Sequence, residues 1–165
     1  MTMNSIDRRA FVGLAGTAAI GALAAGIGNG RALAAGSYQV THTAAEWRQL
    51  LGPQRFNILR QEGTERPFSS PLLKEHRRGI FTCAGCALPL YPSTTKFDSH
   101  TGWPSFWAAI PNAVLTKSDS SLFMDRTEVH CRRCGGHLGH IFDDGPKPTG
   151  KRHCINGLSL NFRPA

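Results

Sequence analysis

Five cysteines are divided unequally along the chain, and their spacing indicates two kinds of chemistry. Four of them form two Cys-x-x-Cys pairs, Cys83 with Cys86 and Cys131 with Cys134. Two such pairs supply four thiolates at the spacing that a tetrahedral zinc ion requires. A site filled by four thiolates is structural, because no position is left open for a substrate. The sequence therefore predicts one structural Zn²⁺ per chain; the alternatives are two disulfides or a redox-active pair.

Each Cys-x-x-Cys pair is expected to form a tight turn that presents two sulfurs to the same ion. Gly85 and Gly135 are expected to give the two turns their backbone freedom. The long segment between the pairs means that the metal would join distant parts of one fold.

The fifth cysteine, Cys154, has no cysteine partner and lies within the run Arg-His-Cys-Ile-Asn at 152–156. If this run is extended, Arg152, Cys154 and Asn156 share one face, because alternate side chains of a strand point the same way. An arginine beside a thiol favours the thiolate, which is the form that attacks electrophiles. The alternative is a buried structural cysteine, which is common in protein cores.

Two histidines follow the second cysteine pair directly. The run Gly-Gly-His-Leu-Gly-His at 135–140 places His137 and His140 in what its glycines predict to be a loop, anchored by the metal. A bend at Gly139 is needed for both imidazoles to face one pocket. The alternative is a pair of histidines with structural or surface roles.

An aromatic run surrounds Trp103, in the sequence Gly-Trp-Pro-Ser-Phe-Trp at 102–107. Pro104 stiffens a turn that displays the aromatic side chains. A rigid indole wall suits a small apolar group such as a methyl, and sulfur packs well against aromatic rings. The alternative is an ordinary core cluster.

The elements that must position these residues change along the chain. A capping box at Thr43–Glu46 and the break at Gly52-Pro53 predict two short helices, and 71–77 a third. From Gly79 onward, short runs separated by Gly, Pro, Ser and Asp are typical of antiparallel strands and loops. These runs are 80–82, 113–116, 122–124, 127–130 and 158–162. The predicted fold class is α+β, mainly β, pinned by a zinc site of four cysteines.

Residues 1–34 have the pattern of a targeting segment. Arg8 and Arg9 precede an apolar Gly/Ala-rich stretch, and Ala32-Leu33-Ala34 offers a small-x-small cleavage pattern. This predicts a twin-arginine-type signal, bacterial export to the periplasm, and a single domain at 35–165 with no stable membrane association after cleavage. The alternative is an uncleaved anchor, which the glycines of the stretch disfavour.

The formal net charge of +8 would by itself suit nucleic acid. The basic residues are scattered, however, apart from Arg77-Arg78 and Arg132-Arg133, and an exported protein rarely meets nucleic acid. A solvated surface and no nucleic-acid partner are therefore expected, and nothing in the sequence suggests more than a monomer.

Taken together, these motifs resemble the methionine-R-sulfoxide reductases of the zinc-containing B type. The resemblance covers roughly residues 42–163. It implies two twisted antiparallel sheets with N-terminal helices, zinc at the end away from the active site, and reduction of the R epimer of methionine sulfoxide, usually within a protein. The matching motifs are the two Cys-x-x-Cys pairs, Gly-Trp-Pro-Ser-Phe at 102–106, Arg-Thr-Glu-Val at 126–129, Gly-Gly-His-Leu-Gly-His at 135–140 and Arg-His-Cys-Ile-Asn at 152–156.

The resemblance assigns catalytic roles that the residue chemistry supports. Cys154 is the nucleophile that attacks the sulfoxide sulfur and becomes a sulfenic acid. His140, helped by His137, is the acid that protonates the departing oxygen.

Three further residues are assigned supporting roles by the same resemblance. Trp103 receives the S-methyl group of the substrate. Arg152 lowers the pKa of the thiol, and Asn156 helps to orient a histidine.

One departure from the family pattern changes the expected mechanism. Many members carry a resolving cysteine two residues before the tryptophan, where this chain has Thr101. The sulfenic acid is therefore expected to react directly with an external reductant, either a thioredoxin-like dithiol or a small thiol. His153 stands where an aromatic residue is frequent, and in an extended run it faces away from the site. The competing interpretation of the whole chain is a non-catalytic binding module on the same zinc-held β scaffold.

Overall fold

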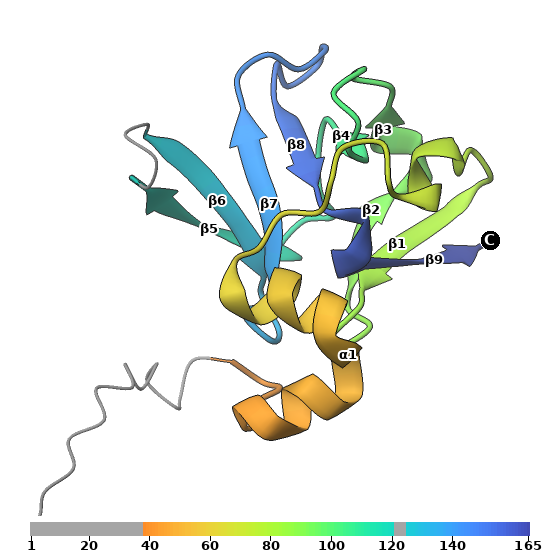
Figure 1. Ribbon diagram of the computed structural model, residues 1–165. Coiled ribbons are helices and arrows are strands. Elements are labelled where there is room, and N and C mark those ends of the chain that lie inside the picture. The colour runs from red at the N-terminus through yellow and green to blue at the C-terminus, as the bar shows by residue number, and fades with distance from the viewer. Residues whose placement is uncertain (1–37, 121–124) are drawn as a thin grey trace, which may run out of the picture. The chain divides into compact units, whose positions relative to one another are not determined.

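The computed structural model describes residues 38–120 and 125–165, which form a helix packed on two antiparallel sheets (Figure 1). One sheet is six-stranded, with the order β3-β4-β8-β7-β6-β5, and the other is three-stranded, with the order β2-β1-β9. This architecture confirms the predicted α+β, mainly β class. The predicted signal at 1–34 and the predicted strand at 122–124 lie outside the described residues.

The strands are short, and several coincide with the runs predicted from the sequence. Three predicted runs, at 80–82, 113–116 and 127–130, fall within or overlap β1, β5 and β6. The strand predicted at 158–162 is only partly correct, because its first residues belong to a 3-10 turn. The bounds are β1 Gly79–Cys83, β2 Pro89–Pro92, β3 Lys96–Phe97, β4 Ser105–Phe106, β5 Val114–Asp119, β6 Arg126–Cys131, β7 His137–Phe142, β8 Arg152–Ile155 and β9 Leu160–Pro164, with 3-10 turns at Pro71–Lys74, Ser93–Thr95 and Gly157–Ser159.

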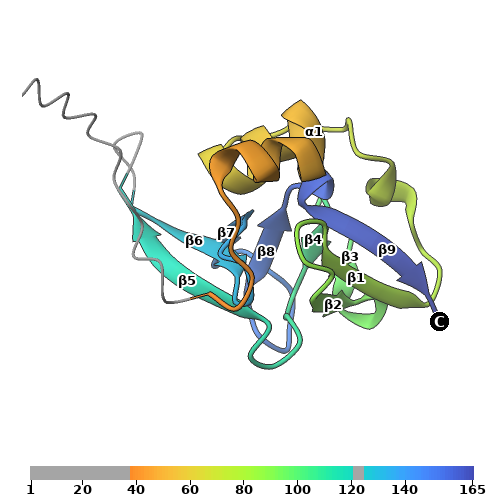
Figure 2. The ribbon, with the colours of Figure 1, turned by 90° about the horizontal axis from the view of Figure 1, so that it is seen from below.

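Helix α1, Ala44–Gln61, begins at the predicted capping box. The Thr43 backbone N–H donates to Glu46 Oε2 over 2.7 Å, and the Glu46 N–H donates to Thr43 Oγ1 over 3.3 Å. Gly52, with φ 69°, interrupts the helical backbone, so α1 consists of the two predicted helical segments joined at a kink. α1 packs against β7 and against the 3-10 turn before β9 (Figure 2).

An aromatic cluster fills the space between the two sheets. Tyr91 of β2 stacks on Phe106 of β4 with ring centroids 4.4 Å apart, and Phe81 of β1 meets Phe106 edge-on at 5.0 Å. All three rings are fully buried. His153 of β8 joins this core, with Nδ1 at 3.2 Å from the Tyr91 hydroxyl, and burial lowers the pKa of His153 to about 4. His153 therefore points into the core and away from Cys154, as expected.

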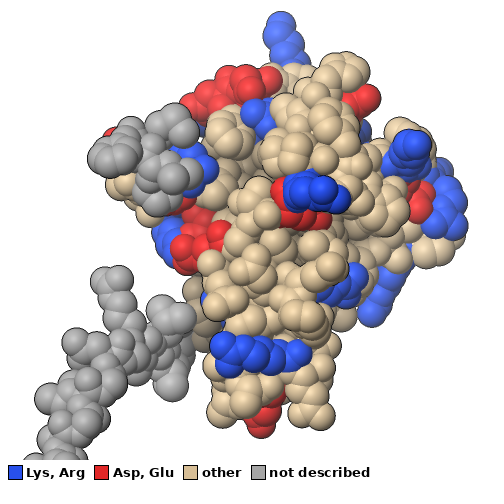
Figure 3. Space-filling view, in the orientation of Figure 1, with Lys and Arg blue, Asp and Glu red and all other residues tan. Residues whose placement is uncertain are grey.

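The surface of the described residues carries charges of both signs. Figure 3 shows Lys and Arg side chains at several separate places on one face, with Asp and Glu side chains between them. Interspersed charges are the usual arrangement of a surface in contact with water. Among the described residues, no helix has the length and the apolar character needed to cross a membrane.

Candidate active site and zinc centre

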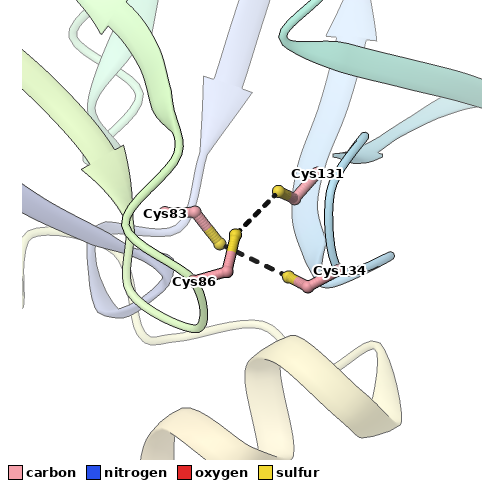
Figure 4. Close-up of side chains that lie close together, drawn as sticks. All are labelled: Cys83, Cys86, Cys131 and Cys134. Carbon is pink, nitrogen blue, oxygen red and sulfur yellow. Dashed lines mark hydrogen bonds between the residues drawn. The ribbon is translucent and has the colours of Figure 1, made fainter. Parts of the chain in front are cut away.

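Four cysteines converge from distant parts of the chain (Figure 4). The Sγ atoms of Cys83 and Cys134 are 3.7 Å apart, those of Cys86 and Cys131 are 3.5 Å apart, and all four lie within 4.8 Å of one another. None of the four forms a disulfide. A tetrahedral zinc ion with Zn–S bonds of about 2.3 Å needs sulfurs about 3.8 Å apart. The four thiols therefore fit one structural Zn²⁺, as predicted.

The two Cys-x-x-Cys pairs form equivalent turns. In the first, the N–H of Ala87 donates to the carbonyl of Cys83, and in the second the N–H of Gly135 donates to the carbonyl of Cys131, both over 2.8 Å. The residue that closes each turn has a positive φ, 59° at Ala87 and 67° at Gly135. The expectation that Gly85 supplies the backbone freedom is wrong, because the left-handed position falls on Ala87. The expectation for Gly135 is confirmed.

Helix α1 braces this cluster. The guanidinium of Arg60 donates to the carbonyl of Cys134 over 2.9 and 3.0 Å and lies 3.4 Å from its Sγ. The same guanidinium lies over the Trp47 ring, 4.2 Å from its centroid. A cation beside the thiolates offsets part of their charge, so α1 contributes to the metal centre as well as to the core.

His137 and His140 lie on strand β7, in the middle of the six-stranded sheet, and the prediction of a glycine-rich loop is wrong. A Cβ atom at Gly139 would collide with the carbonyl oxygen of Cys154 on the neighbouring strand. The glycine therefore marks a close approach of two backbones within a sheet, which is its other common use in strands.

A β-bulge brings both histidines to one side of the sheet. Val129 of β6 is paired with Gly139, whereas His130 is paired with His137, so Leu138 is an extra residue on β7. One extra residue reverses the alternation of side chains, and residues three apart then share a side. The two imidazole centroids are 5.5 Å apart. The sequence predicts a bend at Gly139; the irregularity is instead this bulge at Leu138, which places both imidazoles on one side of the sheet.

The strand register sets a polar row across the sheet. His140 is paired with Cys154 of β8 on one side and with Glu128 of β6 on the other. Cys154 is paired in turn with Ser105 of β4, and Glu128 with Lys117 of β5. Directly opposed residues of an antiparallel pair project from the same face. A thiol, a titratable imidazole and a buried carboxylate are therefore neighbours in one row.

A pocket of about 150 Å³ opens beside Cys154. Four of the predicted site residues line it, namely Cys154, His140, Trp103 and Asn156, whereas His137 and Arg152 do not. Its full lining consists of Thr64, Trp103, Arg126, Gly139, His140, Phe142, Cys154 and Asn156. A larger hollow, of about 490 Å³ between α1 and β9, contains none of the predicted catalytic residues.

Opposing effects act on the pKa of the Cys154 thiol. Burial is the largest and raises the pKa, while the charge of Arg152 and hydrogen bonds from Thr101 and Arg152 lower it. Arg152 is itself bound to Asp144 by two hydrogen bonds of 2.9 Å. The expected lowering of the thiol pKa by Arg152 is present, but burial outweighs it and the net shift is upward.

His140 is held by a carboxylate that no sequence motif marks. Its Nε2 lies 2.8 Å from Asp119 Oδ2, and Arg126 donates to the same oxygen over 2.7 Å. Burial lowers the pKa of His140, and the hydrogen bond to Asp119 opposes that shift. Asp119 therefore stabilises the protonated imidazole, which is the form that an acid catalyst uses.

His137 lies behind His140 and is only 2% exposed. Its Nδ1 is 2.8 Å from Glu128 Oε1, and burial lowers its pKa to about 4. His137 is therefore neutral at neutral pH. It contacts the His140 ring, which lines the pocket.

Asn156 and Trp103 are fixed by Glu65, a residue that the sequence analysis missed. The Asn156 side chain donates to the carbonyl of Leu138 over 3.1 Å and accepts from the Glu65 N–H over 3.0 Å. Asn156 thus holds the backbone carbonyl beside His137 and, among the described contacts, makes no hydrogen bond to a histidine ring. Trp103 Nε1 donates to the Glu65 carbonyl over 3.2 Å, and the buried Glu65 carboxylate accepts from the two N–H groups after Asn156. Glu65 thus joins both pocket walls.

A chain of hydroxyls runs beside Cys154. Thr101 Oγ1 lies 2.8 Å from Ser99 Oγ, which lies 2.7 Å from the buried Ser105 Oγ. Ser105 is the β4 neighbour of Cys154, and the Thr101 hydroxyl lies near enough to lower the pKa of the thiol. The position where a resolving cysteine is expected in the family is therefore close to Cys154.

Comparisons with known proteins show which family this chain is similar to. The family described as SelR domain matches residues 51–164. A protein of Methanosarcina barkeri named Peptide methionine sulfoxide reductase MsrB is 54% identical over 75% of this chain and 88% of its own length. A protein of the same name from Agrobacterium fabrum is 50% identical over 78% of this chain and 96% of its own. A solved structure titled "Crystal Structure of Mis18 'Yippee-like' Domain" aligns with 54% of this chain and 98% of its own, at 17% identity and a TM-score of 0.45, which is too weak a likeness to carry an argument.

Proposed function

Because the chain belongs to the SelR-domain family of peptide-methionine (R)-S-oxide reductases, we propose that it reduces methionine-R-sulfoxide in proteins with Cys154 as the nucleophile. The observation that carries this assignment is the pairing of Cys154 with His140 in the sheet, where both line one pocket with Trp103. The competing interpretation as a binding module is not favoured, because the matched relatives are named as reductases.

The proposed chemical step transfers one oxygen atom. The Cys154 thiolate attacks the sulfoxide sulfur, and the oxygen takes a proton from the protonated His140 imidazole. The hydroxyl then moves to Sγ, while the bond from the methionine sulfur to oxygen and its new bond to Sγ both break and the methionine sulfur keeps an electron pair. In balance, a thiol and a sulfoxide become a sulfenic acid and a thioether, so cysteine is oxidised by two electrons and methionine sulfoxide is reduced by two.

The pocket suits the end of one methionine sulfoxide side chain. Trp103 offers a flat apolar surface to the S-methyl group, and its indole cannot turn freely because Nε1 is bound to the Glu65 carbonyl. His140 stands on the β7 side of Cys154, so the sulfoxide oxygen must point that way while the methyl group points to Trp103. Only one of the two sulfur configurations satisfies both contacts with the chain entering from solvent, which is the proposed basis of epimer choice.

The oxidised enzyme needs a thiol from outside. Of the five cysteines, four form the metal cluster, and Thr101 stands where a resolving cysteine is expected. We infer that two external thiol groups reduce the Cys154 sulfenic acid, giving a disulfide of the reductant, one water and the free Cys154 thiol. A thioredoxin-like dithiol or a small thiol would serve.

The zinc ion takes no part in these steps. Arg126 at the start of β6 lines the pocket, whereas Cys131 at its end binds the metal, so the length of a strand separates them. When bound, zinc supplies a fixed anchor for the two sheets.

The place of action is also a proposal. The pattern at 1–34 supports a twin-arginine-type signal and periplasmic action of the domain at 35–165 on oxidised proteins, as a monomer. Fractionation of a bacterial host with and without a working twin-arginine translocase tests it. Mature protein in the periplasm of both strains would contradict the route.

The deciding experiment is turnover of the separated R and S epimers of a methionine sulfoxide peptide by the zinc-loaded chain, with dithiothreitol as reductant. We expect consumption of the R epimer alone, abolished by Cys154→Ser. Mass spectrometry after one equivalent of substrate, with a sulfenic-acid trap, should locate one oxygen on Cys154. A folded, zinc-loaded sample that turns over neither epimer would overturn the proposal.

A further inference from the structure

We propose that Glu128 is a positioning residue for this reaction. Its carboxylate holds His137 in the tautomer protonated at Nδ1 and thereby fixes the His137 imidazole behind His140. The inference rests on the proposed function of His140 as the proton donor. It adds a buried carboxylate on β6, outside the pocket lining, to the residues on which turnover depends.

The carboxylate of Glu128 is buried and directed at His137. Glu128 is 3% exposed and His137 is 2% exposed. Glu128 Oε1 lies 2.8 Å from His137 Nδ1, the length of a strong hydrogen bond in which the imidazole N–H donates to an ionised oxygen. A carboxylate has no proton to give, so this contact requires the proton on Nδ1.

The other side of the carboxylate faces a positive charge. Lys117 Nζ lies 2.7 Å from Glu128 Oε2, and it also lies 2.6 Å from Glu62 Oε1 at the surface. Burial of an unpaired carboxylate is costly, whereas the ammonium group stabilises its ionised form. Lys117 therefore favours the ionised form of Glu128. Oε2 of Glu128 faces the ammonium group as an ion pair, although it accepts no hydrogen bond among the described residues, and Oε1 faces His137.

With the proton on Nδ1, the Nε2 atom of His137 carries a lone pair. This Nε2 is buried and has no hydrogen-bond partner among the described residues. The His137 ring meets the His140 ring at 5.5 Å between centroids and an interplanar angle of 65°. A change of tautomer would leave a buried N–H on His137 Nε2 without an acceptor. If the His137 ring turned to find an acceptor, it would displace His140.

The substitution Glu128→Gln is the sharpest test, because the amide has one accepting oxygen and one donating NH2 group, whereas both oxygens of the carboxylate accept. The ammonium group of Lys117 attracts the amide oxygen, so the NH2 end is left facing His137 Nδ1. That group donates, and Nδ1 can accept only when it is unprotonated. Glu128→Gln is therefore expected to move the proton from Nδ1 to Nε2 without changing side-chain volume. The same kind of substitution in the serine protease triad lowers kcat through the wrong tautomer.

The first measurement needs no variant. Long-range proton–nitrogen correlation spectra of the zinc-loaded full chain at neutral pH report which ring nitrogen of His137 carries its proton. We expect the proton on Nδ1 alone. A proton on Nε2 in the unmodified protein would overturn the inference, whatever the variants do.

The second measurement compares two carboxylates that share one lysine. In Glu128→Gln we expect the His137 proton on Nε2 and kcat for the R-sulfoxide peptide lowered roughly 10- to 100-fold, with little change in KM. In Glu62→Gln, where the altered side chain is 62% exposed, we expect the tautomer and kcat of the unmodified chain. Zinc content and the alkylation rate of Cys154 should be the same in all three proteins.

The outcomes separate this inference from the proposed function. If the unmodified chain reduces the R epimer but Glu128→Gln keeps both its tautomer and its kcat, the inference alone is wrong. If the unmodified chain reduces neither epimer, the proposed function fails, and the tautomer of His137 still tests the role of Glu128. A Glu128→Gln protein that does not fold leaves the spectrum of the unmodified chain as the test.

Discussion

His140 and Cys154 are directly opposed residues of the antiparallel strands β7 and β8, so the proposed acid and nucleophile are fixed by backbone pairing. Opposed side chains of such a pair have Cβ atoms roughly 5 Å apart, which leaves room for a sulfoxide group between them. A site placed on paired strands needs no loop closure to bring these two groups together.

Replacement of His140 by asparagine should remove the proton donor and leave the nucleophile in place. We expect kcat for the R-sulfoxide peptide to fall roughly 100-fold or more, because positioned acid catalysis contributes 10²–10⁴-fold. The alkylation rate of Cys154 should change little. The control is His76→Asn, at an exposed position outside the pocket. Equal kcat in both variants would exclude His140 as the acid.

The charge of Arg152 should set the pH at which Cys154 becomes reactive. Burial raises the pKa of this thiol and Arg152 opposes the rise, so Arg152→Met should raise the pKa further. At a fixed pH near 8, iodoacetamide should then alkylate Cys154 several-fold more slowly, since the thiolate is the nucleophile. The pH dependence of that rate under pseudo-first-order conditions is the measurement.

Removing the charge of the Asp144 carboxylate should shift the pKa of Cys154 in the opposite direction. Asp144 raises the pKa of Cys154, so Asp144→Asn should lower it and speed alkylation slightly. The effect should be the smaller of the two, because the Asp144 side chain is 61% exposed and screened by water. Shifts of the same sign in both variants would contradict the electrostatic explanation.

Thr101 is close enough to Cys154 for a cysteine there to act as a resolving thiol. The Thr101 hydroxyl lies near enough to the thiol to lower its pKa, so Thr101→Cys should trap the sulfenic acid as a disulfide between positions 101 and 154. After one equivalent of substrate and no reductant, mass spectrometry should show the loss of two hydrogens and no free thiol at either position. Thr101→Ser, the matched control, should give the sulfenic acid. Persistence of the sulfenic acid in Thr101→Cys would show that the loop cannot bring the thiols together.

Much of the site follows from local sequence patterns. The zinc ligands follow from cysteine spacing, and the shared direction of Arg152 and Cys154 follows from strand alternation. Strand β7, which carries His137 and His140, could not be predicted from the sequence, because three glycines between residues 135 and 139 favour a loop. In the structure Gly139 instead permits the close approach of β7 to β8. This is a tertiary contact, and the local propensity of the residues for loop or strand cannot predict it.

Supporting residues were missed for a related reason. Asp119, Glu65 and Glu128 act through partners 21, 91 and 9 residues away in the sequence, and none stands in a pattern that singles out a carboxylate. Glu128 belongs to a recognised motif, Arg-Thr-Glu-Val, but its role depends on the bulge that turns His137 toward it. The fold class was predictable from the capping box and from short runs separated by turn residues, whereas these pairings depend on strand register.

His153 should make the protein sensitive to acid. Its pKa is lowered from 6.5 to about 4 by burial, so below pH 6.5 the unfolded chain binds a proton that the folded chain does not. Stability due to the neutral imidazole is therefore full above pH 6.5 and is lost progressively as the pH falls to about 4, by roughly 3 kcal/mol. His153→Phe removes this loss, so its stability should fall less between pH 7 and pH 4.5.

Urea unfolding of both proteins at the two pH values isolates this difference. The variant leaves the buried Tyr91 hydroxyl without its partner, which should cost about 1–2 kcal/mol at both pH values. That cost cancels when the change with pH is compared. Protonation of the zinc thiolates likewise affects both proteins equally. An identical loss of stability on acidification would mean that His153 does not titrate between pH 7 and 4.5.

Zinc removal should loosen both sheets together. Cys83 ends β1 of the three-stranded sheet and Cys131 ends β6 of the six-stranded sheet, so the metal joins the two at one end. Structural zinc sites contribute many kilocalories per mole to folding, and the apo protein would bury four thiols within 4.8 Å with nothing to bind them. Cys83→Ser should therefore lower the melting temperature by about 10 °C or more and reduce the zinc content below one per chain.

The matched control is Cys154→Ser, which changes the same atom at the one cysteine outside the cluster. It should keep one zinc per chain and a melting temperature within a few degrees of the unmodified protein, because no metal bond is lost. Turnover should be absent in Cys154→Ser, whereas Cys83→Ser should retain some at low temperature, since the pocket lies at the other end of β6. A Cys83→Ser protein with a full zinc complement and an unchanged melting temperature would mean that the four thiols do not share one ion.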